Sequence, residues 1–166
     1  MSMNHCVECG AKLEERLLEK EGMIPWCPSC QAFRFPIFNT AVSMVVADEE
    51  AEKILLIQQY GRPRWILVAG YVTRGEAAET TVRREVMEEV GLKVDKVRFN
   101  RSRFFEPSNT LMLNFTASVS SQDEVTITDE VDRWQWFTYE EAREAIFPNS
   151  LAEEFLLGWL KDNVKA

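Results

Sequence analysis

The chain has 166 residues, 46% of them hydrophobic, and a formal net charge of −8 at pH 7. This length allows one ordinary domain and a small additional module, and the hydrophobic content is sufficient for a core. The negative charge disfavours broad electrostatic binding to nucleic acid, and no stretch approaches the roughly 18 apolar residues that a membrane-spanning helix requires.

The N-terminal segment predicts a small metal-binding module. Its first residues lack the charged and apolar regions of a signal peptide, so we expect a cytoplasmic protein. All four cysteines lie within the first thirty residues, in two Cys-x-x-Cys pairs with seventeen residues between them: Cys6, Cys9, Cys27 and Cys30. This spacing is typical of a four-cysteine zinc ribbon, because one tight turn in each pair brings two thiolates to one ion. We therefore predict a structural Zn²⁺ site in residues 1–35.

Other uses of the cysteines fit less well. Disulfides are rare in the cytoplasm, and a redox dithiol would need only one pair. Four thiolates leave no open coordination position, which argues against catalytic zinc. The segment between the pairs, residues 12–21, is compatible with either strands or a short helical turn. His5 is the only histidine and lies in this module, which argues against a histidine-based triad elsewhere.

Residues 36–166 show the pattern of a single α+β domain. Apolar runs and apolar–polar alternation predict strands at 40–47, 53–58, 94–105, 111–119 and around residues 134–137. A short apolar run at 65–69 leads into a glycine-containing loop. Helices are predicted at 139–145 and from residue 151 to about residue 161.

The most informative stretch runs from Gly70 to Leu92. Between Glu76 and Gly91 it contains no Gly or Pro, which predicts a helix that ends at a glycine. Glu76 and Glu79 are expected in the first turn of this helix, where acids interact favourably with the helix dipole. At about 100° per residue, one face carries an apolar stripe: Ala78, Val82, Val86 and Val90.

Three glutamates lie near this stripe. Glu85 falls at its edge, Glu88 a little further round, and Glu89 inside it. A carboxylate that points toward a core needs a partner, because an unpaired buried charge is too costly. A hard divalent cation such as Mg²⁺ would supply that partner. On this pattern alone, a solvated acidic helix face remains an equal alternative.

The spacing of the whole stretch resembles the Nudix box at every fixed position. The matched positions are Gly70, Glu76 after five residues, Arg84-Glu85-Val86 after seven more, then Glu88-Glu89, Gly91 and Leu92. The resemblance implies an α/β/α sandwich, here preceded by the zinc ribbon, that uses Mg²⁺ or Mn²⁺ to hydrolyse a diphosphate bond in a nucleoside diphosphate derivative. It also implies that Glu85, Glu88 and Glu89 are metal ligands, that the Gly70 carbonyl is a backbone ligand, and that Glu76 and Arg84 brace the box.

A zinc ribbon ahead of a Nudix box resembles the NADH pyrophosphatases. Ser102 and the pair Leu111-Met112 match the ends of a further family motif, but residues 103–106 depart from its Pro-Trp-Pro-Phe centre. Residues 148–152 resemble the family step at the head of the last helix. By this resemblance, the substrate-binding candidates are Arg103, Phe105, Ser150 and Ala152. The alternative for Arg103 and Phe105 is that they are ordinary residues at the end of a strand.

Glu130 lies six residues before Trp136, as does a glutamate in the same family. The resemblance implies that Glu130 is an extra metal ligand or the general base. Asp129 and Asp132 lie close by, so a simple loop acid is the alternative reading.

The sequence therefore predicts a metal-dependent pyrophosphohydrolase that cleaves a dinucleotide such as NADH or NAD⁺ into two mononucleotides. Glu88 or Glu130 would accept the proton of the attacking water, and Glu85, Glu88 and Glu89 would hold the ions. Alternative substrates are FAD, ADP-ribose, dinucleoside polyphosphates and NAD-capped RNA. The alternative outside enzymes is a nucleotide-binding sensor whose ribbon is an interaction module. We expect a homodimer with no membrane or general nucleic-acid partner.

Overall fold

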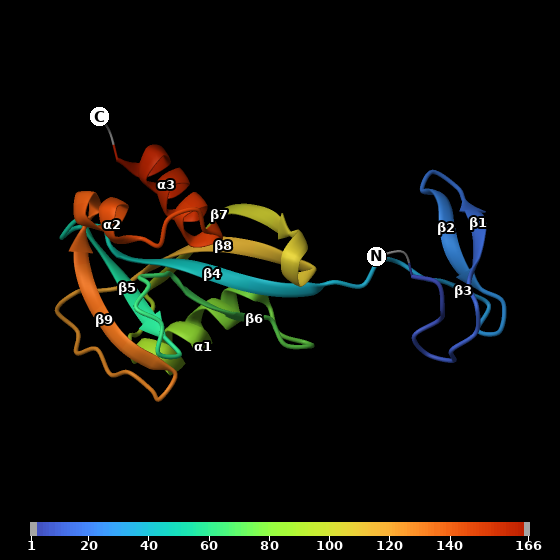
Figure 1. The fold of residues 1–166 in the computed structure, drawn as a ribbon, viewed down its shortest axis with the longest axis horizontal. Helices are drawn as coiled ribbons and strands as arrows, with labels where there is room; N and C mark the ends of the chain where they lie inside the picture. Colours follow the sequence, from blue (N-terminus) through green and yellow to red (C-terminus); the bar gives the residue numbers. More distant parts are fainter. Residues whose placement is uncertain (1–2, 165–166) are drawn as a thin grey trace. The chain divides into compact units, whose positions relative to one another are not determined.

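The computed structural model describes residues 3–164 (Figure 1). The chain forms two compact units, one that ends at Phe38 and one that begins at Asn39. No helix in the described part of the chain is long and apolar enough to cross a membrane.

The N-terminal unit is a three-stranded antiparallel sheet in the order β1 (Glu14–Leu18), β2 (Gly22–Cys27) and β3 (Ala32–Phe33). The segment between the cysteine pairs therefore forms strands rather than a helical turn. Of the described residues in this unit, only Cys6 and Cys27 are buried. A sheet this small, without an apolar core, needs a cross-link or a bound metal for stability.

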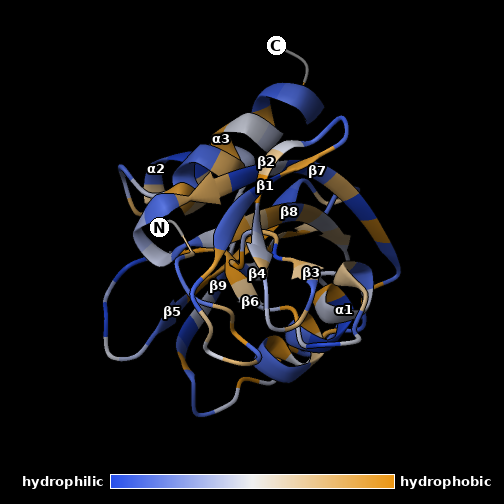
Figure 2. Cartoon of the chain, turned by 90° about the vertical axis from the view of Figure 1, so that its right-hand side faces the viewer, coloured by the Kyte–Doolittle hydropathy of each residue, from blue (hydrophilic) through white to orange (hydrophobic). Residues whose placement is uncertain are grey.

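The larger unit contains a mixed sheet in the order β7-β8-β4-β5-β9, and β6 pairs with β4 beside β5. The strands are β4 (Asn39–Asp48), β5 (Lys53–Gln59), β6 (Val68–Tyr71), β7 (Lys96–Phe105), β8 (Thr110–Ser118) and β9 (Val131–Thr138). β4 runs parallel to β8, and every other pairing is antiparallel. In Figure 2, hydrophilic and hydrophobic residues alternate in the first part of β7, residues 96–99, and residues 100–103 are all hydrophilic.

Helices cover both faces of this sheet, as Figure 1 shows, and the predicted sandwich is confirmed. On one face, α1 (Ala78–Val90) buries Val82, Val86 and Val90 against the sheet. On the other face lie α2 (Tyr139–Ala145), which buries Ala142, and α3 (Leu151–Asn163), which buries Phe155 and Trp159 in the same second core. The apolar stripe read from the helical period is therefore the face that α1 turns inward.

The prediction that Glu76 lies in the first turn of this helix is wrong. Helix α1 begins at Ala78 with Ala77 as its N-cap, and its C-cap Gly91 has φ +70°. Glu76 instead closes the loop before the helix, since its carboxylate accepts a hydrogen bond from the Thr73 hydroxyl at 2.9 Å. Glu76 therefore belongs to a hydrogen-bonded turn with Thr73, two residues before the helix begins.

A buried polar network joins β7, β8 and α3. Asn100 is the extra residue of a β-bulge in β7, and its side chain donates to Asn114 Oδ1 at 2.9 Å. The fully buried hydroxyl of Thr116 donates to Asn100 Oδ1 at 2.9 Å and accepts from Trp159 Nε1 at 2.8 Å. Each polar group therefore has a partner inside the second core, as burial demands.

Replacing Thr116 with Val should lower the free energy of unfolding by about 1–3 kcal/mol, because Trp159 and Asn100 would each lose a buried partner without a change in shape. Urea denaturation followed by circular dichroism measures this change. Ser118→Ala is the matched control, since Ser118 lies two residues along β8 and its hydroxyl donates to the exposed Glu49 at 3.3 Å. Equal stability of the two variants would contradict the role given to the network.

Candidate active site and cysteine cluster

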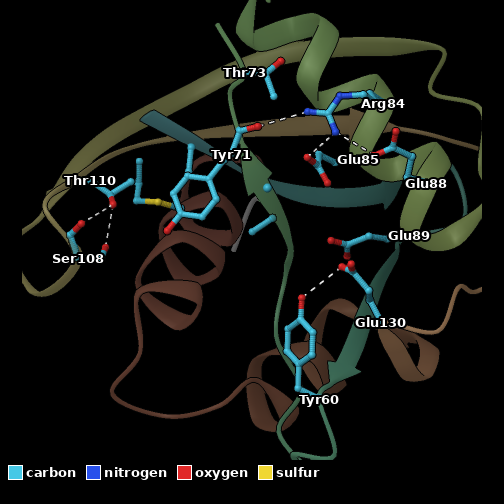
Figure 3. A pocket seen from close by; sticks show the side chains of 14 residues that line it. Tyr60, Tyr71, Thr73, Arg84, Glu85, Glu88, Glu89, Ser108, Thr110 and Glu130 are labelled. Carbon is cyan, nitrogen blue, oxygen red and sulfur yellow. Dashed lines mark hydrogen bonds and ion pairs between the residues drawn. The ribbon is translucent and has the colours of Figure 1, made fainter. Parts of the chain in front are cut away.

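A cavity of about 540 Å³ in the larger unit gathers the acidic side chains of the glycine–helix stretch (Figure 3). Its wall includes α1, β6, the end of β5 and the loop before β9. The acidic residues that line it are Glu85, Glu88, Glu89 and Glu130. We refer to it below as the carboxylate pocket.

The period of α1 sets the depth of its three glutamates. Glu89 is only 5% exposed, Glu85 is half-buried, and Glu88 lies at the surface. This order is the one that the helical wheel predicts. The three carboxylates therefore form a gradient from the core to the mouth of the pocket.

Arg84 holds the acids of this region together. Its guanidinium binds Glu76 through two bonds, from Nε to Oε1 at 3.0 Å and from Nη2 to Oε2 at 3.1 Å. Its Nη1 donates to Glu85 at 2.8 Å and to Glu88 at 2.9 Å. Arg84 therefore bridges two of the candidate ligands, and it lowers the pKa of Glu76 to about 2.

Gly70 makes room for Glu85. A Cβ atom built on Gly70 would lie 2.0 Å from Cδ and 2.2 Å from Oε1 of the Glu85 side chain. The carboxylate thus rests directly against the backbone of β6, where only glycine permits so close an approach. The requirement for glycine at this position is a requirement of the pocket rather than of a turn.

Glu89 is buried beside other acids. Its carboxylate accepts a hydrogen bond from Gln59 Nε2 at 3.0 Å. Burial raises the pKa of Glu89 to about 8; the hydrogen bond from Gln59 opposes this shift, and the charges of Glu85 and Glu130 add to it. Burial also raises the pKa of Glu85, against the effect of Arg84. In both cases burial is the main cause, because it disfavours the charged form of a carboxylate.

Glu130 reaches the same pocket from the loop before β9. Its Oε2 accepts a hydrogen bond from the Tyr60 hydroxyl at 3.2 Å. Figure 3 shows the Glu130 and Glu89 carboxylates turned toward one another. Four carboxylates from two elements are the oxygen donors that a hard divalent cation prefers, so the donor set fits Mg²⁺ or Mn²⁺.

The opposite wall of the pocket is uncharged and was missed from the sequence. It consists of Ala41, Ala69, Tyr71, Ser108, Thr110 and Met112. Tyr71 is 59% exposed, so its ring is open to a ligand. The strand at residues 68–71 could have revealed part of this wall. Successive residues of a strand point to opposite faces, so Ala69 and Tyr71 lie on the face opposite to Gly70.

The predicted substrate-binding residues lie elsewhere. Arg103, Phe105 and Ser150 line a separate cavity at the beginning of α3, and Arg103 Nε lies 3.6 Å from Glu154 Oε1. Ala152 is half-buried in the first turn of α3 and packs against the second core. None of the four lines the carboxylate pocket, and their predicted role stays a prediction.

The four cysteine sulfurs of the N-terminal unit lie within 4.8 Å of one another. Cys6 Sγ and Cys30 Sγ are 3.9 Å apart, and Cys9 Sγ and Cys27 Sγ are 3.5 Å apart. Tetrahedral Zn²⁺ with Zn–S bonds of about 2.3 Å separates its sulfurs by about 3.8 Å. The geometry therefore fits a four-thiolate metal site.

A positively charged side chain, that of Arg34, contacts this cysteine cluster. Arg34 donates from Nε to Cys6 Sγ at 3.2 Å, which lowers the pKa of Cys6 to about 6. Hydrogen bonds with Cys9 and Cys27 raise the pKa of Cys30 to about 12. Four crowded thiols cannot all ionise on their own, and a bound cation would remove that limit.

Comparison with known proteins places these sites in context. A model of the NUDIX domain matches residues 38–156. The NAD-capped RNA hydrolase ndx-9 of Caenorhabditis elegans is 31% identical over 156 residues, covering 91% of this chain and 41% of that protein. NAD-capped RNA hydrolase NudC of Pseudomonas aeruginosa is 31% identical over 138 residues, covering 80% of this chain and 47% of that protein. The chain thus spans less than half the length of these two relatives.

Solved structures show the same fold. A NUDIX hydrolase from Nitrosomonas europaea superposes with a TM-score of 0.64 at 19% identity, over 98% of this chain and 92% of that one. The MutT protein of Methanosarcina mazei Go1 superposes with a TM-score of 0.65 at 21% identity, over 77% of this chain and 96% of that one.

The contact between Gly70 and Glu85 generates a prediction. Gly70→Ala should leave the fold intact, since the Glu85 carboxylate is the flexible end of a side chain, but it should displace that carboxylate from the pocket. We expect the affinity for Mn²⁺, measured by isothermal titration calorimetry, to fall by about tenfold or more.

Gly158→Ala is the matched control. Its Cβ would also meet the end of a flexible side chain, Arg101 Nη1 at 2.3 Å, and neither residue lines the pocket. This control should bind Mn²⁺ as the unaltered protein does. Unchanged Mn²⁺ affinity in a folded Gly70→Ala protein would show that Mn²⁺ binding does not depend on the position of the Glu85 carboxylate.

Proposed function

Since this chain belongs to the Nudix hydrolase family, we propose that its carboxylate pocket hydrolyses the diphosphate bond of a dinucleotide such as NADH or NAD⁺. The observation that carries the proposal is the pocket itself. Four carboxylates line one wall, and a small apolar surface with an exposed tyrosine lines the other. The first wall suits a metal-bound diphosphate, and the second suits a nucleoside ring.

The acidic wall would bind the ions. Glu85, Glu88, Glu89 and Glu130, with the Gly70 carbonyl, are the proposed ligands for Mg²⁺ or Mn²⁺, and Glu76 holds Arg84 against Glu85 and Glu88. When bound, such an ion neutralises phosphoryl charge and lowers the pKa of a coordinated water.

The chain itself would supply the base. Glu88 and Glu130 are the exposed carboxylates of the pocket and can be reached by water, so either is suited to accept a proton. The water oxygen forms a bond to one phosphorus, the bridging P–O bond breaks, and the bridging oxygen leaves with the other phosphate. Each product is then a mononucleotide with a terminal phosphate.

The uncharged wall would hold a base or nicotinamide ring. Tyr71 offers an aromatic face, and Met112 offers a thioether that packs well against rings. Ala41 and Ala69 are small enough to leave room for a flat ligand between these side chains. Ser108 and Thr110 lie at the same wall, where the Ser108 hydroxyl donates to the Thr110 hydroxyl at 2.9 Å.

The relatives support a nicotinamide dinucleotide. Both ndx-9 and NudC bear names that describe hydrolysis of NAD-capped RNA, in which the same dinucleotide is attached to a longer chain. NAD-capped RNA is therefore the second candidate substrate. A sensor without activity is disfavoured because all the box carboxylates are present.

The cysteine cluster would be a structural zinc ribbon in residues 1–35, followed by the hydrolase domain in residues 36–166. The closed set of four thiolates supports a structural role, because no position remains for a substrate or water. The fold of the ribbon would then depend on Zn²⁺, and hydrolysis in the carboxylate pocket would depend on Mg²⁺ or Mn²⁺.

Glu89→Gln should lower kcat on NADH by about 10²–10⁴-fold, because it removes the most deeply buried carboxylate of the pocket while keeping the shape of the side chain. Glu79→Gln is the control, since Glu79 is an exposed residue of the same helix outside the pocket. Near-normal turnover by a folded Glu89→Gln protein would overturn the assignment.

A substrate panel tests the proposal directly. We expect the highest kcat/KM for NADH or NAD⁺ among NADH, NAD⁺, FAD, ADP-ribose, a diadenosine polyphosphate and an NAD-capped RNA oligonucleotide, each assayed with Mg²⁺ and with Mn²⁺. A clear preference for the capped RNA would favour the second candidate. Absence of turnover on every compound would favour the sensor.

The purified protein should contain about one Zn²⁺ per chain by elemental analysis, and Cys27→Ser should abolish this content, because the geometry offers one four-thiolate site. The variant should keep the circular dichroism signal of the larger unit. Full zinc content in the Cys27→Ser protein would place the metal elsewhere.

A further inference from the structure

A tight turn at the end of β5 carries an unusual backbone. The amide of Arg62 donates to the carbonyl of Gln59 at 3.1 Å, so Tyr60 and Gly61 are its central residues. Both have positive φ angles, +56° and +66°. Hairpin turns of this hand favour Gly, Asn or Asp at such positions, and a bulky side chain there is an outlier. The tyrosine is therefore held in a conformation that its own backbone disfavours.

Three consecutive residues of this turn each bind one acid. Gln59 donates to Glu89 at 3.0 Å, and the Tyr60 hydroxyl donates to Glu130 at 3.2 Å. The Gly61 amide donates to the Asp132 carboxylate at 2.6 Å. Glu89 belongs to α1 and Glu130 to the loop before β9, so one short turn links two separate elements of the pocket.

The strand that follows Glu130 is fitted to this turn. In the pairing of β5 with β9, Gln58 lies opposite Arg133 and Gln59 lies opposite Val131, which leaves Asp132 as an extra residue. Such a bulge redirects neighbouring side chains and is common beside active sites. Here the bulge allows the Asp132 carboxylate to accept the hydrogen bond from the Gly61 amide, and it places Glu130 within hydrogen-bonding distance of Tyr60.

Glu130 depends on this contact more than the other acids do. It is exposed and lies outside any helix or strand, whereas Glu85, Glu88 and Glu89 are fixed by α1. In residues 3–164, the one hydrogen-bond donor to its carboxylate is the Tyr60 hydroxyl. Without that donor, an exposed glutamate would occupy many rotamers.

We propose that Tyr60 is a positioning residue: its hydroxyl holds the Glu130 carboxylate in the pocket, at a fixed distance from Glu89, which the neighbouring Gln59 holds. This inference rests on the proposed function, in which Glu130 is a ligand or base. It also explains why a strained conformation persists at Tyr60, since the turn aims the hydroxyl at the pocket.

The test uses Tyr60→Phe, which keeps the ring and removes the hydroxyl. We expect kcat on the best substrate of the panel to fall by about tenfold, the change expected when one hydrogen bond to a charged group is lost, with little change in KM. The double variant Tyr60→Phe/Glu130→Gln should be no slower than Glu130→Gln alone, because both changes act on one group. Tyr139→Phe is the control, since Tyr139 packs against Trp159 outside the pocket.

Wild-type kcat in Tyr60→Phe would overturn the inference, as would a double variant slowed by the product of the two single effects. A raised KM with unchanged kcat would also overturn it, because it would make Tyr60 a substrate contact instead.

Crystal structures of the protein and of Tyr60→Phe, each with Mn²⁺, separate this inference from the proposed function. We expect the Glu130 carboxylate to be ordered beside Glu89 in the first and displaced in the second. If no compound of the panel is hydrolysed, the proposed function fails, and these structures still decide whether Tyr60 positions Glu130. An unmoved carboxylate in the variant would overturn the inference by itself.

Discussion

Four carboxylates line one pocket and repel one another, and the neighbouring groups of the site reduce this repulsion. One guanidinium, that of Arg84, binds Glu85 and Glu88 and is itself held by Glu76. Glu89 is buried, and burial raises its pKa to about 8. In the function proposed above, a divalent cation would offset the charge of these carboxylates with the oxygen ligands that it prefers.

The pleat of a single short strand divides the pocket into two chemical halves. In β6, Gly70 faces α1 and leaves space for the Glu85 carboxylate, while Ala69 and Tyr71 face the other way. Metal ligands and an uncharged surface are thus adjacent without sharing a face. A diphosphate joined to a nucleoside has the same division between charge and ring.

Much of the site follows from sequence because it is local. The helical period alone gives the burial order of Glu85, Glu88 and Glu89. The uncharged wall could not be predicted in this way, because it depends on the register of β4, β6 and β8, which no local pattern specifies. Arg103 and Ser150 lie in a different cavity at the beginning of α3, where Ser150 is the N-cap of that helix. The prediction that Glu76 lies in the first helical turn was wrong because it did not anticipate the hydrogen bond between Thr73 and Glu76, which belongs to the preceding loop.

The parallel pairing of β4 with β8 bears on how this molecule is made. Asn39 lies opposite Thr110, so the centre of the sheet joins residues that are far apart in the chain. Pairings of this kind form late, because a long loop must close before any contact rewards it. During synthesis, β4 would have to wait, unpaired on that edge, until β8 has left the ribosome. The acidic wall is assembled later still, because Glu130 follows β8 in the chain and must be synthesised before it can join Glu85, Glu88 and Glu89.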